Sequence, residues 1–511
     1  MKETIRRENI RKWGIFEAIL EGPSGGNPFT QQEIKGVFRG ADETVSCDGF
    51  YDGDGIYRIR FMPSFEGEYT YKIESSFGKS EEGSFFVNPP EEGCHGPVRV
   101  ADTWHFAYED GTPYYSIGTT CYVWNLQSDE RISDTLKTLA HSAFNKIRFC
   151  IFPKHYDYNL GEPRSYPYEG TPMDSRVLTK ENFGQYTGKT EGNHWDFTRF
   201  NVAHFRHIEL CIKKLQKLGV EADLIMMHPY DRWGFSCMQP EEDDLYWKYA
   251  VARFGAYANV WWSLANEYDL MPAKSVRDWE RYAGILCEKD PYHHLRSIHN
   301  CASMYDYRRP WITHCSIQKT DVYKSSEMAD EWRARYGKPV VMDEIAYEGD
   351  IQHSWGNITG EEMVRRFWEA ACRGAYPGHG ETYLNEEDIL WWSHGGVLHG
   401  ESHKRFPFLL DIMKETPGLG LMPYRSNGDG VCAVPQEMTS AGTVVKDYYL
   451  FYYSFMRPSF KDFYFDEDSK WKVRVLDTWN MTIEDRGIYQ GKFRVELPAR
   501  QYMAIQIRRI F

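Results

Sequence analysis

The sequence predicts an α/β protein in which a (β/α)8 TIM barrel is flanked by two small all-β sandwich domains. Three observations support this prediction. From about residue 96 to residue 424, short apolar runs typical of buried strands alternate with amphipathic stretches of helical periodicity. On either side of this region, apolar and polar residues alternate in short runs bounded by turn residues, as in antiparallel sheets. The chain has 511 residues, whereas a single core seldom exceeds about 250–300 residues, so several domains are expected.

The first domain is expected to span residues 1–95. Alternating runs occur at residues 34–38, 55–61 and 67–73, and turn signals such as Asp-Gly and Pro-Ser separate them. Closely spaced short strands of this kind are typical of a β-sandwich. The sequence Asn-Pro-Pro-Glu-Glu-Gly at 88–93 then has the composition of a linker.

The barrel is expected to span residues 96–424. The predicted strands are residues 113–121, 144–152, 220–227, 260–264, 295–298, 311–317, 340–342 and a last strand near 375 or 382. Helices are expected at 132–143, 205–218, 245–254, 276–288, 327–336, 361–373 and 404–413. Parallel strands of this kind close into a barrel whose functional site lies at their carboxyl ends. The insertion at 153–200 and the stretch 378–400 are expected to rise over that end.

The last domain is expected to span residues 425–511. Alternation returns at 431–434, 447–453, 471–476, 491–496 and 502–507. These short runs predict a second β-sandwich. The chain shows neither an internal repeat nor a low-complexity tract.

The charge balance argues against nucleic acid as a partner. The chain carries 60 Lys and Arg residues against 74 Asp and Glu residues, a formal net charge of −14 at pH 7. Binding to a phosphate backbone needs a basic surface, which this balance does not provide. Aromatic residues make up 16% of the chain, with 17 Trp and 35 Tyr. Aromatic faces stack on sugars, so this content favours a carbohydrate partner, although all-β domains also use many aromatic residues.

No targeting or membrane segment is expected. The first ten residues carry charges where a signal peptide needs an apolar core, and nowhere do about 18 apolar residues follow one another. We therefore expect a cytoplasmic protein without a membrane partner, unless a leader has been removed. The 11 Cys residues are scattered singly, without C-x-x-C spacing. This pattern indicates free thiols and predicts neither a zinc site nor a disulfide framework.

Two carboxylates follow predicted strands of the barrel. The apolar run at 260–264 leads to Asn266 and Glu267, and the run at 338–342 leads to Asp343 and Glu344. A single Glu after a strand is more often a solvated loop residue. A pair across one barrel mouth is what glycoside hydrolysis needs, with one acid and one nucleophile or base. Their separation distinguishes retention, at about 5–5.5 Å, from inversion, at about 6.5–9.5 Å.

Other polar and aromatic residues are placed to contact a sugar at the same mouth. His228 follows the third predicted strand, His299 the fifth, and His314 lies near the sixth. Trp124 after the first strand and Trp392 after the eighth are candidate stacking platforms. A lone His is more often a satisfied structural residue and a Trp is more often core, so both alternatives stay open for each of these side chains.

These motifs resemble a known family. The Ala-Asn-Glu sequence that ends at Glu267 and the Asp-Glu that ends at Glu344 resemble the signature of the clan A retaining glycoside hydrolases. The domain order resembles the bacterial apiosidase-like, cellulase-related glycosidases with a sandwich on each side of a TIM barrel. The stretches 378–383 and 396–401 support this likeness, which covers nearly the whole chain.

The resemblance implies roles for several residues. Glu267 would be the acid/base and Glu344 the nucleophile. Asn266 would bond the sugar hydroxyl next to the reacting carbon, and Arg148 would keep the nucleophile ionised; a structural ion pair is the alternative for Arg148. The clan commonly places a Tyr after the sixth strand, but residues 314–318 read His-Cys-Ser-Ile-Gln, so the partner of the nucleophile stays open. Two further candidates for sugar contact are His379 and Glu381.

The sequence therefore predicts a retaining, exo-acting β-glycosidase for oligosaccharides derived from plants or polysaccharides. We expect no cofactor and no metal, and an oligosaccharide as the partner; the oligomeric state stays open, with a homo-oligomer as one alternative. A non-catalytic carbohydrate-binding protein is disfavoured because it would not need both carboxylates. A metal-dependent amidohydrolase would need H-x-H after the first strand, and residues 118–121 read Gly-Thr-Thr-Cys. A transglycosylase stays an alternative.

Overall fold

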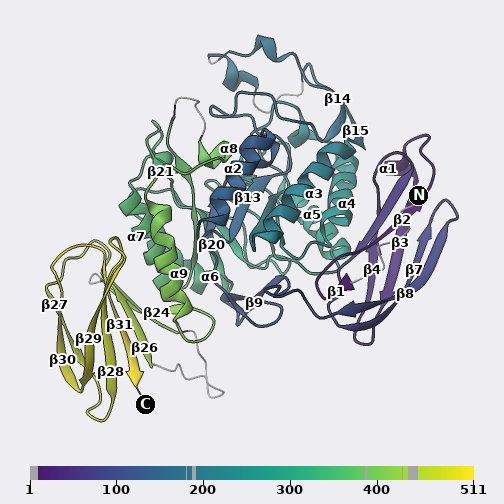
Figure 1. The fold of residues 1–511 in the computed structure, drawn as a ribbon. Coiled ribbons are helices and arrows are strands. Elements are labelled where there is room, and N and C mark those ends of the chain that lie inside the picture. Colours follow the sequence, from purple (N-terminus) through teal and green to yellow (C-terminus); the bar gives the residue numbers. More distant parts are fainter. Residues whose placement is uncertain are drawn as a thin grey trace.

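A ring of eight parallel strands forms the centre of the computed structural model (Figure 1). The structure describes residues 10–179, 181–186, 191–385, 390–427, 430–435 and 447–510. In chain order around the ring, the strands are β12 (Gly118–Thr120), β13 (Lys146–Cys150), β16 (Glu221–Ile225), β17 (Val260–Ser263), β18 (Arg296–Ser297), β19 (Cys315–Gln318), β20 (Val340–Glu344) and β22 (Tyr376–His379). A parallel bridge between His299 and Ser316 joins the β18 side to β19 and closes the ring. The predicted (β/α)8 TIM barrel is confirmed.

Helices cover the outside of the ring. They are α2 (Asp129–Ala140), α3 (Val202–Lys217), α4 (Pro240–Phe254), α5 (Val276–Lys289), α6 (Ala329–Tyr336), α7 (Gly360–Cys372) and α9 (Phe406–Lys414). Local signals set their ends: the Ser128 side chain caps α2, the Thr359 side chain caps α7, and Gly337 ends α6 in the left-handed conformation. Every residue of β13, β16, β17 and β20 is buried, as expected for strands covered on both faces.

The amino end of the barrel is closed by a small antiparallel sheet. It consists of β9 (Val98–Ala101), β10 (His105–Tyr108) and β11 (Pro113–Tyr114). The ring of Phe106 packs against Trp261 and Tyr376, which lie at the amino ends of their strands. Because this end is filled with aromatic side chains, only the carboxyl end is left for a substrate site.

The two β-sandwiches lie on opposite sides of the barrel (Figure 1). The N-terminal sandwich consists of two sheets. In order, the strands of the first sheet are β1 (Ile10–Arg11), β8 (Ser80–Asn88), β7 (Gly67–Ser75), β3 (Ile34–Arg39) and β4 (Thr44–Asp48), and those of the second are β2 (Phe16–Glu21), β6 (Ile56–Phe61) and β5 (Phe50–Tyr51). A short helix, α1 (Pro28–Gln31), follows β2. Alternation buries Tyr69, Tyr71 and Ile73 of β7, so the predicted period of two is confirmed.

The C-terminal sandwich packs on the outer side of α7. Its sheets are β24 (Leu421–Asn427), β25 (Gly430–Pro435), β26 (Tyr448–Tyr452), β31 (Met503–Ile510), β28 (Lys470–Asp477), β29 (Thr482–Gln490), and β27 (Phe460–Tyr464) with β30 (Lys492–Glu496). The rings of Trp368 and Tyr452 lie 5.9 Å apart across this interface. Contact on both sides explains why α7 is buried along almost its whole length.

Several predicted boundaries differ from the structure. The sixth strand begins at Cys315 and not at residue 311, and the eighth is Tyr376–His379. Residues 113–121 divide into β11 and β12, and the expected boundary at residue 425 falls within β24. The insertion at 153–200 contains the hairpin β14 (Tyr168–Thr171) and β15 (His194–Phe200). The expected segments include residues 1–9, 180, 187–190, 386–389, 428–429, 436–446 and 511, which lie outside the described residues.

Within the described ranges, no helix combines the length and the apolar character that crossing a membrane requires.

A buried charge network fastens the N-terminal sandwich to the barrel helices. Arg60 of β6 forms an ion pair with Glu209 of α3 at 2.5 Å and donates to the backbone carbonyl of Arg253 at 2.7 Å. The guanidinium of Arg253 also reaches Glu209 and, at 2.7 Å, Asp52. Two buried guanidinium groups therefore share one glutamate.

We predict that Glu209→Ala destabilises the protein strongly, because it leaves Arg60 and Arg253 buried without a shared counter-charge. The loss of one partner of a buried ion pair costs about 3–5 kcal/mol. In chemical denaturation, the variant should unfold at a lower midpoint concentration of denaturant than the wild type. Glu33→Ala, which removes an exposed ion pair with Lys35, should change this midpoint little. Equal midpoints for the two variants would contradict this role.

Candidate active site

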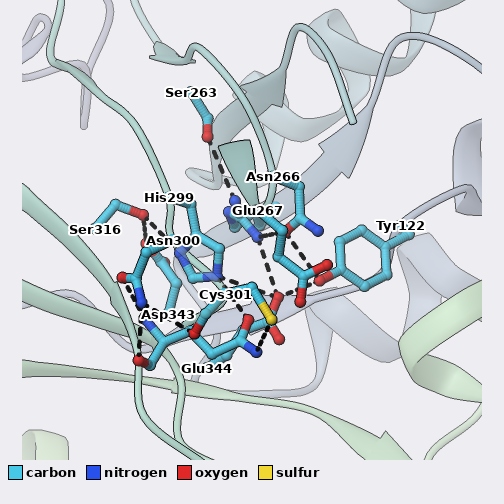
Figure 2. Close-up of polar contacts among 12 residues, drawn as sticks. Tyr122, Ser263, Asn266, Glu267, His299, Asn300, Cys301, Ser316, Asp343 and Glu344 are labelled. Atoms are coloured by element: carbon cyan, nitrogen blue, oxygen red, sulfur yellow. Dashed lines mark hydrogen bonds and ion pairs between the residues drawn. The ribbon is translucent and has the colours of Figure 1, made fainter. Parts of the chain in front are cut away.

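Two glutamates lie buried at the carboxyl end of the barrel (Figure 2). Glu344 is the last residue of β20, and Glu267 follows β17 by four residues. Glu267 has a left-handed backbone with φ of 50°, which is uncommon for a residue with a side chain. The backbone around it is held by bonds from Asn266 N to Met227 O at 2.9 Å and from Tyr268 N to His299 O at 3.0 Å. Neighbouring loops therefore impose the turn that aims Glu267 inward.

Three side chains converge on Glu344. The phenol of Tyr122 donates a hydrogen bond to Oε1, and Arg148 Nη1 and His299 Nε2 each lie 3.4 Å from the same oxygen. Burial by itself would raise the pKa of Glu344, but the hydrogen bond and charge of His299, the charge of Arg148 and the Tyr122 bond lower it to about 2. Glu344 is therefore ionised at neutral pH.

Glu267 has the opposite electrostatic environment. Burial, reinforced by repulsion from Glu344, raises the pKa of Glu267 above its ordinary value. The hydrogen bond donated by Tyr230 and the charges of Lys154 and His299 oppose this rise without cancelling it. Two neighbouring carboxyl groups with divergent pKa values are the arrangement that separates an acid from a nucleophile.

Asn266 is fixed by the same groups that surround Glu344. Its Oδ1 accepts a hydrogen bond from Arg148 Nη1 at 2.7 Å and lies 3.2 Å from the phenol oxygen of Tyr122, whose one proton points to Glu344. Arg148 also donates to Ser263 Oγ at 3.4 Å. Within the described part of the chain, Asn266 Nδ2 has no hydrogen-bond partner, so this donor is available to a ligand.

A second layer of buried charges lies beneath the two glutamates. Lys146 Nζ bonds Asp223 at 2.8 Å and Asp343 at 2.7 Å, and Ser316 Oγ donates to Asp343 at 2.6 Å. Burial opposes ionisation of Asp343, but the Lys146 charge, followed by that of Arg148, holds the pKa of this carboxyl well below its usual range. His299 Nδ1 lies 3.1 Å from Ser316 Oγ, so this layer also orients the imidazole that reaches Glu344.

Trp392 forms one wall beside these groups. Its ring packs edge-on against Tyr122, with centroids 5.4 Å apart, and lies 5.1 Å from Trp355. The Trp392 carbonyl accepts a hydrogen bond from the Tyr122 backbone at 2.9 Å. The structure thus brings Glu267, Glu344, Asn266, Arg148, His299 and Trp392 into one region.

Other candidate residues lie elsewhere. His314 precedes β19 and packs against Phe106 and Trp261 at the amino end of the barrel, because the sixth strand starts later than the sequence predicts. Trp124 is fully buried and packs against Phe149 at 5.6 Å, as a core residue does. His228, by contrast, lies beyond the third strand at the same end of the barrel as the glutamates, near Lys154 and with its ring 6.5 Å from that of Tyr230, and its Nε2 bonds the Phe152 carbonyl at 3.3 Å.

His379 and Glu381 also lie apart from the two glutamates. His379 Nδ1 bonds Thr119 Oγ1 at 3.0 Å, and its ring packs between Phe144 and Phe406. Glu381 accepts the backbone N–H groups of residues 399 and 400 at 2.5 and 2.8 Å. Glu381 therefore supports the loop at residues 399–400, whereas His379 is packed beside the first barrel strand.

One group could provide metal ligands among the residues that the structure describes. Glu348, His379 and Glu381 each bring one ligand atom within 4.8 Å of the others. Glu348 accepts the N–H groups of residues 401 and 402 at 2.8 and 3.0 Å, directly after the two that Glu381 accepts. Each of the four carboxylate oxygens thus accepts one of four consecutive N–H groups, and the two glutamates act as a clamp on residues 399–402.

Sequence reasoning missed three residues of the site. Tyr122 after the first strand bonds Glu344, and Tyr230 after the third bonds Glu267. Lys154 lies in the insertion after the second strand, beside both phenol rings. The sequence did hold a signal for the two tyrosines, because each lies shortly after a predicted barrel strand, where site residues are expected. Tyr122 also resolves the question raised by residues 314–318, since a tyrosine from the first strand and not the sixth holds Glu344.

Known structures share this architecture. A candidate glycoside hydrolase from Bacteroides vulgatus has 35% identity and a TM-score of 0.89, over 98% of this chain and 100% of that chain. A glycoside hydrolase of family 5 from the same organism has 15% identity and a TM-score of 0.58, over 81% of this chain and 93% of that one. Another glycoside hydrolase has 14% identity and a TM-score of 0.56, over 81% and 97%. The last two likenesses concern the fold alone.

Two family models match the flanking regions. Both are described as domains of unknown function: DUF5060 matches residues 9–76 and DUF5605 matches residues 437–508. A comparison with curated proteins finds no match.

The barrel, its buried pair of carboxylates and the 35% identity over almost the whole of both chains agree with one another. The expected resemblance to clan A enzymes with flanking β domains is confirmed, and a carbohydrate is the substrate. The chain belongs to the glycoside hydrolases.

Proposed function

We propose that this enzyme hydrolyses β-glycosidic bonds with retention, using Glu344 as nucleophile and Glu267 as acid/base. The observation that carries the proposal is the opposite direction of the two pKa shifts at one barrel mouth. An ionised carboxylate is suited to attack, whereas a protonated one is suited to donate to a leaving oxygen.

The reaction would take two steps. Glu267 donates its proton to the glycosidic oxygen while Glu344 attacks the anomeric carbon, which breaks the glycosidic bond and forms a covalent glycosyl-enzyme. Glu267, now ionised, then takes a proton from water, and this water attacks the same carbon and releases Glu344. Two inversions give overall retention, and Glu267 ends the cycle protonated.

The surrounding residues have supporting roles in this proposal. Arg148, His299 and Tyr122 keep Glu344 charged before attack. The free Nδ2 of Asn266 would donate to the hydroxyl beside the anomeric carbon, where a hydrogen bond that strengthens in the transition state contributes to rate. Trp392 would stack on a face of the sugar.

The loops around the mouth support an exo-acting enzyme for short oligosaccharides. Tyr158 of the insertion donates to Gln352 in the loop after β20 at 2.7 Å. Asn159 of the same insertion donates to Ser393, the neighbour of Trp392. Walls from three strands are thus joined by hydrogen bonds, and a joined wall favours a pocket for a chain end over an open groove.

We predict that Glu344→Ala lowers turnover by about 10⁴-fold or more, because no glycosyl-enzyme can form. Added azide should restore cleavage of an activated aryl glycoside and yield a glycosyl azide of inverted configuration, identified by NMR. Glu74→Ala, an exposed carboxylate of the N-terminal sandwich, should keep full activity. Wild-type turnover in Glu344→Ala would refute the nucleophile assignment.

We predict that Glu267→Ala lowers kcat/KM by about 10²–10⁴-fold for a poor leaving group and far less for dinitrophenolate. Since the raised pKa of Glu267 keeps it protonated to higher pH, wild-type activity should fall as pH rises through that pKa. This alkaline fall should disappear in the variant. A pH–rate profile with each substrate measures both effects, and an equal loss on the two substrates would count against the acid role.

The proposed pocket would determine the order in which products appear. After a panel of aryl glycosides has identified the sugar, its trisaccharide should lose one terminal unit at a time. A trisaccharide blocked at its non-reducing end should be at least tenfold slower, because the pocket admits a free chain end. Chromatography of products from the matching polymer completes the test. Early release of mixed internal fragments, or rapid cleavage of the blocked trisaccharide, would show an open groove.

A further inference from the structure

A buried lysine lies between the two tyrosines that bond the catalytic carboxylates. Lys154 follows β13 by four residues, and only 4% of its surface is exposed. Its Nζ lies 3.4 Å from the ring centroid of Tyr122, 4.4 Å from that of Tyr230 and 4.4 Å from that of Trp392. It makes neither a hydrogen bond nor an ion pair with any residue that the structure describes, so aromatic faces are its principal contacts.

Each of these tyrosines serves a different carboxylate. Tyr122 donates to Glu344, and Tyr230 donates to Glu267. A cation on the face of a phenol withdraws electron density from the ring, which makes the O–H group a stronger donor. One ammonium is therefore placed to strengthen the hydrogen bonds that hold both carboxylates.

The charge of Lys154 also acts on the carboxylates directly. It favours the ionised forms of Glu267 and Glu344, without being close enough to either for an ion pair. The other titratable groups around these residues are Cys150, Arg148, Tyr156 and His228 near Lys154, His299 and Cys301 near Glu267, and Tyr347 near Glu344. Among the contacts of these groups, only those of Lys154 include both Tyr122 and Tyr230.

We propose that Lys154 is a positioning residue that sets the ionisation of both catalytic carboxylates through Tyr122 and Tyr230. This inference rests on the proposed roles of Glu267 and Glu344. Burial lowers the pKa of Lys154 to about 8, so the ammonium keeps its charge up to neutral pH. Removal of that charge should raise the pKa of each carboxyl group, because both ionised forms lose a stabilising neighbour.

Lys154→Met tests the proposal by the pH dependence of kcat/KM on a phenyl glycoside. Both the acidic and the alkaline limb should move to higher pH by about one unit, as expected when a buried cation and its contacts are lost. Lys154→Arg, which keeps a positive charge over the rings, should have the same pH–rate profile as the wild type. Lys213→Met is the matched control, because it removes a lysine 5.6 Å from the Tyr257 ring, away from the carboxylates. This control should leave both limbs in place.

Double variants separate the two tyrosine routes. In the Tyr230→Phe background, Lys154→Met should move the alkaline limb less than in the wild type, and in Tyr122→Phe the acidic limb should move less. Equal shifts in all backgrounds would overturn the route through the tyrosines. A uniform loss of rate without any limb shift would overturn the positioning role. If Lys154→Met does not fold, Lys154→Gln provides the same test.

Glu344→Ala, assayed in parallel, keeps the two proposals distinguishable. If Glu344→Ala is inactive and Lys154→Met keeps the wild-type profile, the positioning role fails and the proposed function stands. If Glu344→Ala keeps wild-type turnover, the proposed function itself fails.

Discussion

The barrel mouth must hold two carboxyl groups close together in opposite states of ionisation. Like charges repel strongly where water is excluded, so two buried carboxylates do not both ionise unless cations compensate them. The structure resolves this conflict by unequal surroundings. Glu344 is contacted by Arg148, His299 and the phenol of Tyr122. Glu267 accepts a hydrogen bond from the phenol of Tyr230, and the charges that act on it are more distant. The proposed division into a nucleophile, Glu344, and an acid, Glu267, follows from this inequality.

The inequality has its origin in the strand order. Arg148 belongs to β13, His299 follows β18, and Tyr122 follows β12, so three separate strands supply the partners of Glu344. Beneath them, Lys146 is shared by Asp223 and Asp343, which leaves no buried charge of that layer without a partner. At the opposite end of the barrel, Phe106 of the small antiparallel sheet packs against Trp261 and Tyr376.

The walls of the mouth depend on a second set of carboxylates. Glu348 and Glu381 bind the backbone of residues 399–402, and this loop continues from the helix α8 (Trp391–His394) that bears Trp392. The insertion after β13 bonds Ser393 from the other side. Buried carboxylates in this fold therefore have two separate uses, the proposed chemistry at the barrel mouth and the fixation of a loop outside it.

The sequence by itself determined the barrel, its two flanking sandwiches and the pair Glu267 and Glu344. Hydrophobic period and strand order are local properties, and a parallel barrel brings the carboxyl ends of its strands to one mouth. The tertiary structure alone decided which other side chains share that mouth. A shift of a few residues at the sixth strand places His314 at the opposite end, and the contacts of Tyr122, Tyr230 and Lys154 join loops of different strands. The pKa values of the two glutamates depend on such long-range contacts and on burial, which no local pattern in the chain encodes.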